Sequence, residues 1–307
     1  MQARPDGAGP IAARLHREGA GEATEVRAGD APPGPATWRL DLAYEGTAYR
    51  GWARQPGHRT VEGLLGDALA TVLREPVRLS VAGRTDAGVH AWAQVASFGC
   101  GQRNLPPDRV RLSLNALLPP DIAVTAVSPA ASGFVARRAV SRTYQYRLWL
   151  SPVKPVRDRA YVWDVRGPLD VALLSEAAAL LPGTRDFAAL TPSARLYRTC
   201  VREVLRADWR PSAGYDGPVG EDACAADGDP APAGPAAGAR GRAEWVFTIT
   251  AGSFLHNMVR VAVGSMVDVA QGRMTVDGFA DELASGDRRR MGQTAPARGL
   301  ALVAVAY

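Results

Sequence analysis

A short loop in the first third of the sequence has the composition of a site that displays a carboxylate. The segment Val81–Ala91 reads VAGRTDAGVHA, in which Gly83 and Gly88 enclose Arg84 and Asp86. Glycines let the backbone approach a ligand closely, and small neighbours leave space around the Asp86 side chain. Functional groups are often presented on loops at the end of a strand. An ordinary turn in which Asp86 caps its own backbone has the same composition, so this loop alone leaves both interpretations open.

Two other stretches could contact an anionic ligand. In the loop at 45–60, Arg50 and Arg54 lie beside aromatic residues. Such a mixture can pair with phosphates and stack on bases, and it equally suits a loop held in place by its aromatics. Arg260 lies in the apolar helical pattern FLHNMVRVAVGSMVDVAQ. An arginine there needs a carboxylate or phosphate partner, unless its side chain reaches solvent at the rim of the helix.

The distribution of charge favours a polyanionic partner. Residues 1–36 carry four Arg against five acidic residues, and residues 211–242 carry two Arg against five. Since the whole chain has a net charge of +5, the remainder carries +9. Both low-charge stretches are rich in Gly, Ala and Pro, which predicts a disordered tail over 1–36 and a disordered insertion at about 211–242. The basic remainder has the electrostatic character of a nucleic-acid-binding protein, although basic enzymes without such a partner are common.

Several classes of protein are disfavoured. The three cysteines have no C-x-x-C spacing and the chain has four histidines, so neither a disulfide framework nor a metal site is expected. No apolar run approaches the ~20 residues of a membrane span, and the N-terminal stretch lacks the apolar region of a secretory signal. The sequence therefore predicts a cytoplasmic protein without a metal.

Alternating and amphipathic segments predict a mixed α and β fold, with a β-α-β-β-α-β order in the first half. A regular strand with large side chains on both faces is expected to be central in the second half, and Ser253 is expected to cap the helix that carries Arg260. The expected strands are Thr37–Tyr44, Val77–Val81, Trp92–Phe98, Asp121–Val127, Ser141–Leu150, Arg198–Trp209, Ala243–Thr250 and Leu300–Tyr307; the expected helices are 60–74, 106–117, Leu169–Leu181, 253–271 and Thr275–Ala284.

The loop that carries Asp86, the loop at 45–60 and the helical pattern that carries Arg260 together resemble motifs of the tRNA pseudouridine synthase A family. AGRTDAGVHA (Ala82–Ala91) is similar to the family's catalytic loop, and YEGTAYRGWARQ is similar to its opening motif. The resemblance extends in order from Thr37 to the C-terminus, without the insertion. The other segments that match motifs of this family are NALLPPDIAV, the Phe134-Val-Ala-Arg stretch, SRTYQYRLW, Arg198-Thr199, SFLHNMVRVAVG and GLALVAV.

The resemblance implies an isomerase that converts uridine in tRNA to pseudouridine without a cofactor. It implies Asp86 as the catalytic carboxylate, acting on C1′ or on a ribose proton, and Arg260 as its ion-pair partner. Tyr144 would stack on the uracil and take part in proton transfer at C5. Arg84 would reach a phosphate or fill the space of the flipped nucleotide, and Leu302 would pack under the base.

The resemblance also implies a larger organisation. It predicts an α+β pseudouridine synthase fold in which two similar α/β domains, 37–138 and 139–307, join their mixed, mainly antiparallel sheets around a basic cleft. It further predicts a homodimer whose substrate is the tRNA anticodon stem-loop at tRNA positions 38 to 40. Three alternatives are a synthase for other RNA positions, an RNA-binding module without activity, and a small-molecule hydrolase using Asp86. The hydrolase lacks a second carboxylate or histidine at suitable spacing.

Overall fold

The computed structural model describes residues 36–101, 104, 106–212 and 244–307. The predicted tail over 1–36, apart from Ala36, lies outside the described residues, as does nearly all of the predicted insertion at about 211–242. The described residues form one compact unit. The proposed division of this unit into domains at residue 138 stays a prediction.

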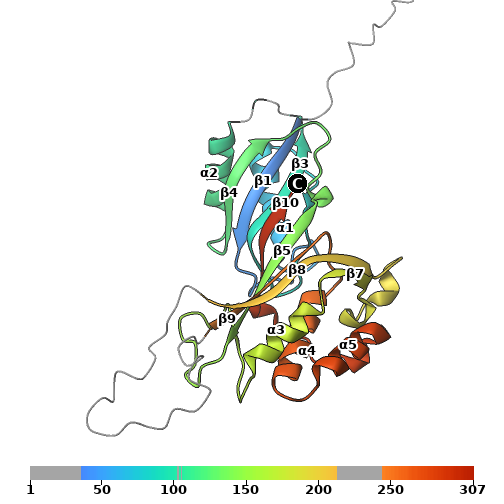
Figure 1. Ribbon diagram of the computed structural model, residues 1–307. Helices are drawn as coiled ribbons and strands as arrows, with labels where there is room; N and C mark the ends of the chain where they lie inside the picture. Colours follow the sequence, from blue (N-terminus) through green and yellow to red (C-terminus); the bar gives the residue numbers. More distant parts are fainter. Residues whose placement is uncertain (1–35, 102–103, 105, 213–243) are drawn as a thin grey trace, which may run out of the picture. The chain divides into compact units, whose positions relative to one another are not determined.

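One mixed sheet forms the frame of the described chain, with the strand order β4-β1-β3-β10-β5-β9-β8-β7, β2 beside β3 and β6 beside β5 (Figure 1). Neighbouring strands are antiparallel except for the parallel pairs β10–β3 and β5–β6. This confirms the predicted α+β class and the mainly antiparallel sheet. The strands are β1 (Ala36–Tyr44), β2 (Ser80–Val81), β3 (His90–Cys100), β4 (Ile122–Pro129), β5 (Ser141–Trp149), β6 (Trp163–Asp164), β7 (Gly183–Asp186), β8 (Val201–Pro211), β9 (Glu244–Ala251) and β10 (Leu300–Ala306).

The C-terminal strand β10 connects the two halves of the sheet. It pairs with β3 through Ala301 and Leu302, and on its other edge it pairs with β5, where Leu302 is opposite Tyr144. Strand β5 is central, as its two-sided pattern predicts, because β9 pairs with its other edge from Arg142 to Trp149. The strands on either side of the predicted insertion, β8 and β9, are antiparallel neighbours, and Pro211 of β8 is opposite Trp245 of β9.

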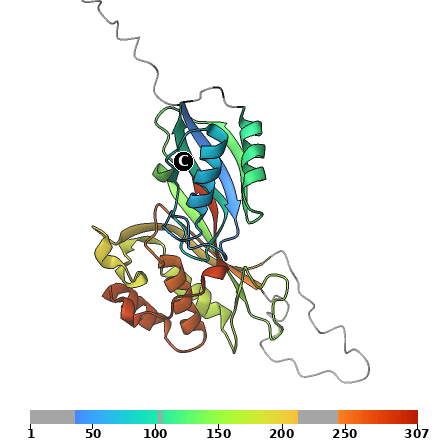
Figure 2. The same cartoon turned by 180° about the vertical axis from the view of Figure 1, so that it is seen from behind.

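Helices α1 (Val61–Leu73) and α2 (Pro107–Leu117) lie on one side of the sheet near β1 and β4 (Figure 2). Thr60 caps α1 as predicted, because its hydroxyl accepts a hydrogen bond from the Gly63 N–H at 3.3 Å. Helices α3 (Val171–Ala179), α4 (Met258–Ala270) and α5 (Val276–Ser285) pack on one another near β8 (Figure 1). Short 3-10 turns are η1 (Ala136–Arg138), η2 (Ala188–Leu190), η3 (Ala194–Leu196), η4 (Arg288–Arg290) and η5 (Ala297–Gly299). No helix in the described part of the chain is both long and apolar enough to span a membrane.

The start of α4 corrects the sequence prediction. Ser253 does not cap this helix, whose N-cap is Asn257 in the left-handed conformation (φ 60°). The preceding residues form a turn instead, since the Met258 N–H donates to the Leu255 carbonyl and Leu255 is buried. As a result Arg260 lies in the first turn of α4 rather than in its middle.

Candidate active site

The loop that carries Asp86 is fixed by backbone and buried side-chain contacts. The Ala82 N–H donates to the Val95 carbonyl (2.9 Å), and the Trp52 N–H donates to the Thr85 carbonyl (3.0 Å). The buried Thr85 hydroxyl lies 2.7 Å from the Tyr44 hydroxyl. None of these contacts uses the Asp86 side chain. The carboxylate is therefore presented by a rigid loop while its side chain remains 36% exposed.

Glycine is required where the loop at 45–60 meets the Asp86 loop. Gly51 has a φ of +89°, and a Cβ placed there would lie 2.7 Å from the Thr85 carbonyl oxygen. Side chains rarely adopt this backbone conformation, and the distance is too short for a carbon atom. The two glycine-rich motifs of the sequence thus form one structural unit, in which each backbone supports the other.

Asp86 opens onto a cavity of about 330 Å³ between segments distant in the sequence. Its walls come from the loop at 50–55, the Asp86 loop and the first turn of α4. A helix N-terminus favours negative charge, so the start of α4 suits an anionic group in this cavity. The lining residues are Arg50, Trp52, Ala53, Gln55, Arg84, Thr85, Asp86, Ala87, His256, Asn257 and Arg260.

The arginine predicted to pair with Asp86 lines the same cavity but has other partners in this structure. Arg260 donates from Nε to the Ala295 carbonyl (2.7 Å) and from Nη1 to Asn257 Oδ1 (2.8 Å). Among the described residues, no Arg260–Asp86 contact within 4 Å is present; Asp86 Oδ1 instead lies 3.6 Å from His256 Nε2. Burial lowers the pKa of Arg260, and the nearby Asp86 charge partly opposes this effect. Arg260 therefore interacts with Asp86 through space rather than by a direct ion pair.

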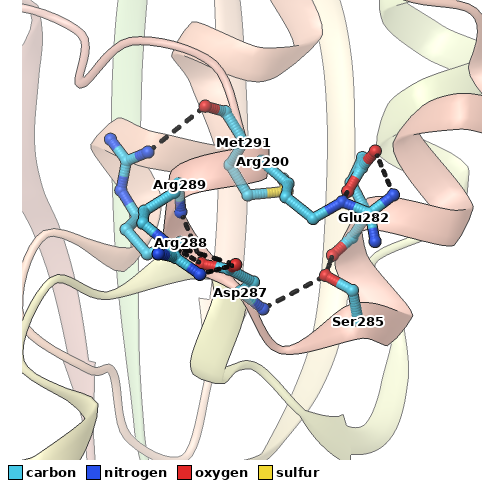
Figure 3. Close-up of polar contacts among 7 residues, drawn as sticks. All are labelled: Glu282, Ser285, Asp287, Arg288, Arg289, Arg290 and Met291. Atoms are coloured by element: carbon cyan, nitrogen blue, oxygen red, sulfur yellow. Dashed lines mark hydrogen bonds and ion pairs between the residues drawn. The ribbon is translucent and has the colours of Figure 1, made fainter.

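The carbonyl that holds Arg260 belongs to the strap, which we define as residues 291–296. The strap is anchored at its start by the basic turn η4, because Arg288 donates to the Met291 carbonyl at 3.3 Å (Figure 3) and to the Thr294 hydroxyl at 2.9 Å. Arg289 pairs with Asp287, which lowers the pKa of that carboxyl to about 2, and Arg290 pairs with Glu282. The basic turn thus has a structural explanation, because it fixes the segment that positions Arg260.

Tyr144 and Leu302 are buried on adjacent strands and do not line the cavity. A Cβ at Gly83 would be 3.4 Å from the Tyr144 hydroxyl, so this hydroxyl lies directly beside the start of the Asp86 loop. The Tyr144 ring packs edge-on against Phe254, with centroids 5.0 Å apart. Burial raises the pKa of Tyr144 well above that of an exposed tyrosine, and the Asp86 charge raises it further. The hydroxyl is therefore protonated at neutral pH.

The predicted arginines fall into two groups. Arg84 and Arg50 are exposed and line the Asp86 cavity. Arg54 points elsewhere: it pairs with Asp67 (2.7 Å), donates to the Gly63 carbonyl, and lines a separate cavity of about 550 Å³ beside α1. The structure thus places Asp86, Arg260, Arg84 and Arg50 around one cavity, with Tyr144 beneath its loop and Arg54 outside it.

His256 is a neighbour of Asp86 that sequence reasoning did not identify. Its Nδ1 lies 2.8 Å from the Ser193 hydroxyl, and its backbone N–H donates to the Tyr197 hydroxyl (2.9 Å). These contacts direct Nε2 toward Asp86. The sequence gives no signal for this proximity, because 170 residues separate the two positions and the histidines show no ligand spacing. Within the described ranges, no cluster of three or more His, Cys, Asp or Glu side chains could hold a metal ion.

Comparison with known proteins assigns the fold and the site to a family. The family model described as "tRNA pseudouridine synthase" matches residues 42–135 and 177–307. The chain belongs to the tRNA pseudouridine synthase family. Members of this family isomerise uridine to pseudouridine in tRNA. Asp86, Arg260 and Leu302 lie in the matched segments, whereas Tyr144 lies in the interval between them.

Individual relatives are similar over nearly the whole chain. The "tRNA pseudouridine synthase A" of Solidesulfovibrio magneticus is 41% identical over 283 residues, covering 89% of this chain and 91% of the relative. Those of Syntrophotalea carbinolica and Geobacter sulfurreducens are 38% and 36% identical, covering 88% of this chain and 95% and 99% of the relatives. The resemblance stated from the sequence motifs is confirmed at the level of the family.

Proposed function

We propose that this chain isomerises uridine to pseudouridine at positions 38 to 40 of the tRNA anticodon stem-loop, with Asp86 as the catalytic carboxylate. The observation that carries the proposal is the position of Asp86. A rigid loop holds this side chain at the mouth of a cavity that Arg50, Arg84 and Arg260 also line. Family membership supplies the reaction class, and the cavity supplies groups suited to an extruded, anionic nucleotide.

The reaction breaks the bond between C1′ and N1 of uridine and forms a bond between C1′ and C5. One proton leaves C5 and one proton is taken up at N1, so atoms and charge balance without a redox partner. An ionised Asp86 serves either route, attack on C1′ or removal of a ribose proton. Arg260 and the N-terminus of α4 place positive charge in the same cavity as Asp86.

Tyr144 is proposed to assist proton transfer at C5, because its hydroxyl lies next to the Asp86 loop while burial keeps it protonated. Replacing Tyr144 by Phe removes one oxygen and retains the packing against Phe254 and Leu302. We expect the single-turnover rate to fall by about 100-fold, within the range of general acid–base contributions, with little change in tRNA affinity. Rapid-quench kinetics and filter binding measure the two quantities.

The control for Tyr144→Phe is Tyr197→Phe, which removes a hydroxyl that accepts a hydrogen bond from the His256 backbone N–H. This variant is expected to keep the rate within about fivefold, because His256 keeps its contact with Ser193 and a single hydrogen bond contributes about 1 kcal/mol or less. Equal losses in both variants would contradict a role of Tyr144 in proton transfer.

Three further properties belong to the proposal. We place the reaction in the cytoplasm, and we propose that two copies of the chain form a homodimer that contacts one tRNA. We also propose that the cleft joining the halves of the chain is basic. The net charge of +5, with more positive charge outside the two low-complexity stretches, supports an RNA substrate and predicts salt-sensitive binding.

The deciding experiment incubates the purified chain with unmodified, uridine-labelled tRNA in EDTA and maps pseudouridine by position. Product confined to positions 38 to 40 is the expected result. Product at other positions would retain the chemistry and overturn the specificity. Folded protein that binds tRNA without forming product would favour an RNA-binding module.

A further inference from the structure

Arg142 on β5 is buried and, among the described residues, pairs with no acidic side chain. The residue is 8% exposed, and its guanidinium donates five hydrogen bonds to four backbone carbonyls. Nε and Nη2 bind the Ala82 carbonyl (2.9 and 2.6 Å), Nη2 also binds Arg137, and Nη1 binds Ala139 and Gly252 (2.7 and 2.6 Å). All five N–H donors of the guanidinium are therefore used.

The four carbonyls belong to three separate segments that meet around the active site. Ala82 directly precedes Gly83 and the Asp86 loop. Arg137 and Ala139 belong to the turn η1 and the residue that follows it, between β4 and β5. Gly252 opens the segment that carries His256 to the cavity and leads into α4. One side chain thus ties together the base of the Asp86 loop and the connection that leads to Arg260.

This arrangement is costly unless every donor is satisfied. Burial of an arginine lowers its pKa, as it does for Arg142, and a buried charge without a carboxylate is normally unfavourable. Five hydrogen bonds to carbonyl dipoles offset that cost. Lysine has three donors on a single atom and cannot reproduce the planar fork that reaches four carbonyls.

Arg142 also lies beside the proposed proton-transfer group. Tyr144 follows it by two residues and points to the same face of β5. A Cβ at Gly83 would be 3.4 Å from the Tyr144 hydroxyl and 3.9 Å from Arg142 Cγ. Gly83, the first residue of the Asp86 loop, therefore lies against the side chains of Tyr144 and Arg142. The carbonyl of the preceding residue, Ala82, accepts hydrogen bonds from the Arg142 guanidinium.

We propose that Arg142 is a positioning residue that fixes the Asp86 loop relative to Tyr144 and to the segment before α4. This inference rests on the proposed function, in which Asp86 and Tyr144 act on the same nucleotide. Arg142 does not line the Asp86 cavity, so its effect is exerted through the backbone carbonyls that it binds. Its loss should impair the chemical step more than the binding of tRNA.

The test compares Arg142→Lys with Arg147→Gln. Arg147 lies on the same strand, and its guanidinium pairs with the buried Glu244, so its replacement should destabilise the fold without touching the Asp86 loop. Both variants are assayed at a temperature where circular dichroism shows them folded. We expect the single-turnover rate of Arg142→Lys to fall by about 100-fold, as expected for misplacement by about 1 Å. Its tRNA affinity should stay within about threefold, and the rate of Arg147→Gln within about twofold.

Wild-type rates of Arg142→Lys, or equal losses in the two folded variants, would overturn the proposal. An inactive wild-type chain would instead overturn the proposed function, so the two failures are distinguishable. If Arg142→Lys does not fold, Ser97→Ala decides. The Ser97 hydroxyl accepts a hydrogen bond from the Ala136 N–H of η1 at 3.0 Å, so its removal loosens the segment whose Arg137 and Ala139 carbonyls bind Arg142. A several-fold loss of rate with unchanged affinity is expected, and an unchanged rate would overturn the proposal.

Discussion

Asp86→Asn is expected to lower the single-turnover rate of pseudouridine formation by more than about 1,000-fold, as removal of an essential catalytic group does in other enzymes. The amide has nearly the same shape as the carboxylate but carries no charge for attack or proton removal. The loop itself should be unchanged, because the hydrogen bonds that hold it use Ala82, Thr85 and the backbone of Asp86 rather than the Asp86 side chain. We therefore expect the Kd for tRNA to stay within about tenfold, or about 1.4 kcal/mol.

Asp170→Asn is the matched control for this substitution. Asp170 caps α3 through a hydrogen bond from the Ala172 N–H at 2.9 Å, and asparagine is an equally good cap. The control should keep both rate and stability. Product formation by Asp86→Asn near the wild-type rate would refute the catalytic assignment. A well-folded variant with greatly weakened tRNA binding would show that Asp86 acts mainly in binding.

The main frame of the fold could be predicted because local patterns determine it. Alternation on β1 and β5 and the Thr60 cap of α1 are signals carried by neighbouring residues. The short strands β6 and β7 were not predicted. Strand β7 is exposed along its four residues and β6 has only two, so neither has an apolar alternation to detect.

The start of α4 could not be predicted for a different reason. Ser253 is a good capping residue by type, but the nearby Gly252 carbonyl is bound by Arg142, and Leu255 is drawn into the core. These tertiary contacts delay the helix until Asn257. A local propensity worth about 1 kcal/mol cannot compete with them.

In the candidate site, too, local patterns identify some residues, whereas others depend on contacts between distant parts of the chain. Asp86 stands out because glycines surround it within one loop, and Arg260 stands out because it interrupts an apolar pattern. Arg142 and His256 act through contacts with residues far away in the sequence. Arg142 binds the Ala82 and Gly252 carbonyls, which are 60 and 110 residues away. Every residue has a backbone carbonyl, so the types of the partner residues do not show that Arg142 binds them. No pattern in the sequence therefore indicates such a role.

Gly264→Ala is expected to destabilise the protein and to impair catalysis together. A helix interior normally favours Ala over Gly by about 1 kcal/mol, so helix propensity alone predicts that Gly264→Ala stabilises the protein. In α4, however, a Cβ at Gly264 would lie 1.8 Å from the Gln293 carbonyl oxygen of the strap. Backbone must move to relieve this overlap, and we expect a net loss of about 3 kcal/mol, which lowers Tm by roughly 5 to 10 °C.

The catalytic effect follows from what the strap holds. The Ala295 N–H donates to the Arg260 carbonyl (3.0 Å), and the Ala295 carbonyl accepts the Arg260 Nε–H. A strap displaced from Gly264 releases the guanidinium beside Asp86, so the rate should fall even at temperatures where the variant is folded. Calorimetry and single-turnover kinetics measure the two effects.

Gly66→Ala, the same change in helix α1, is the control for the direction of the change in Tm. The nearest atom to its added Cβ is Arg54 Nη2 at 2.9 Å, the end of a flexible side chain that can move aside. Helix propensity then dominates, and Tm should stay constant or rise. If Gly264→Ala were likewise neutral or stabilising, the strap would not be held against α4 as described. Loss of stability with an unchanged rate in the folded variant would show that the strap supports the fold without positioning Arg260.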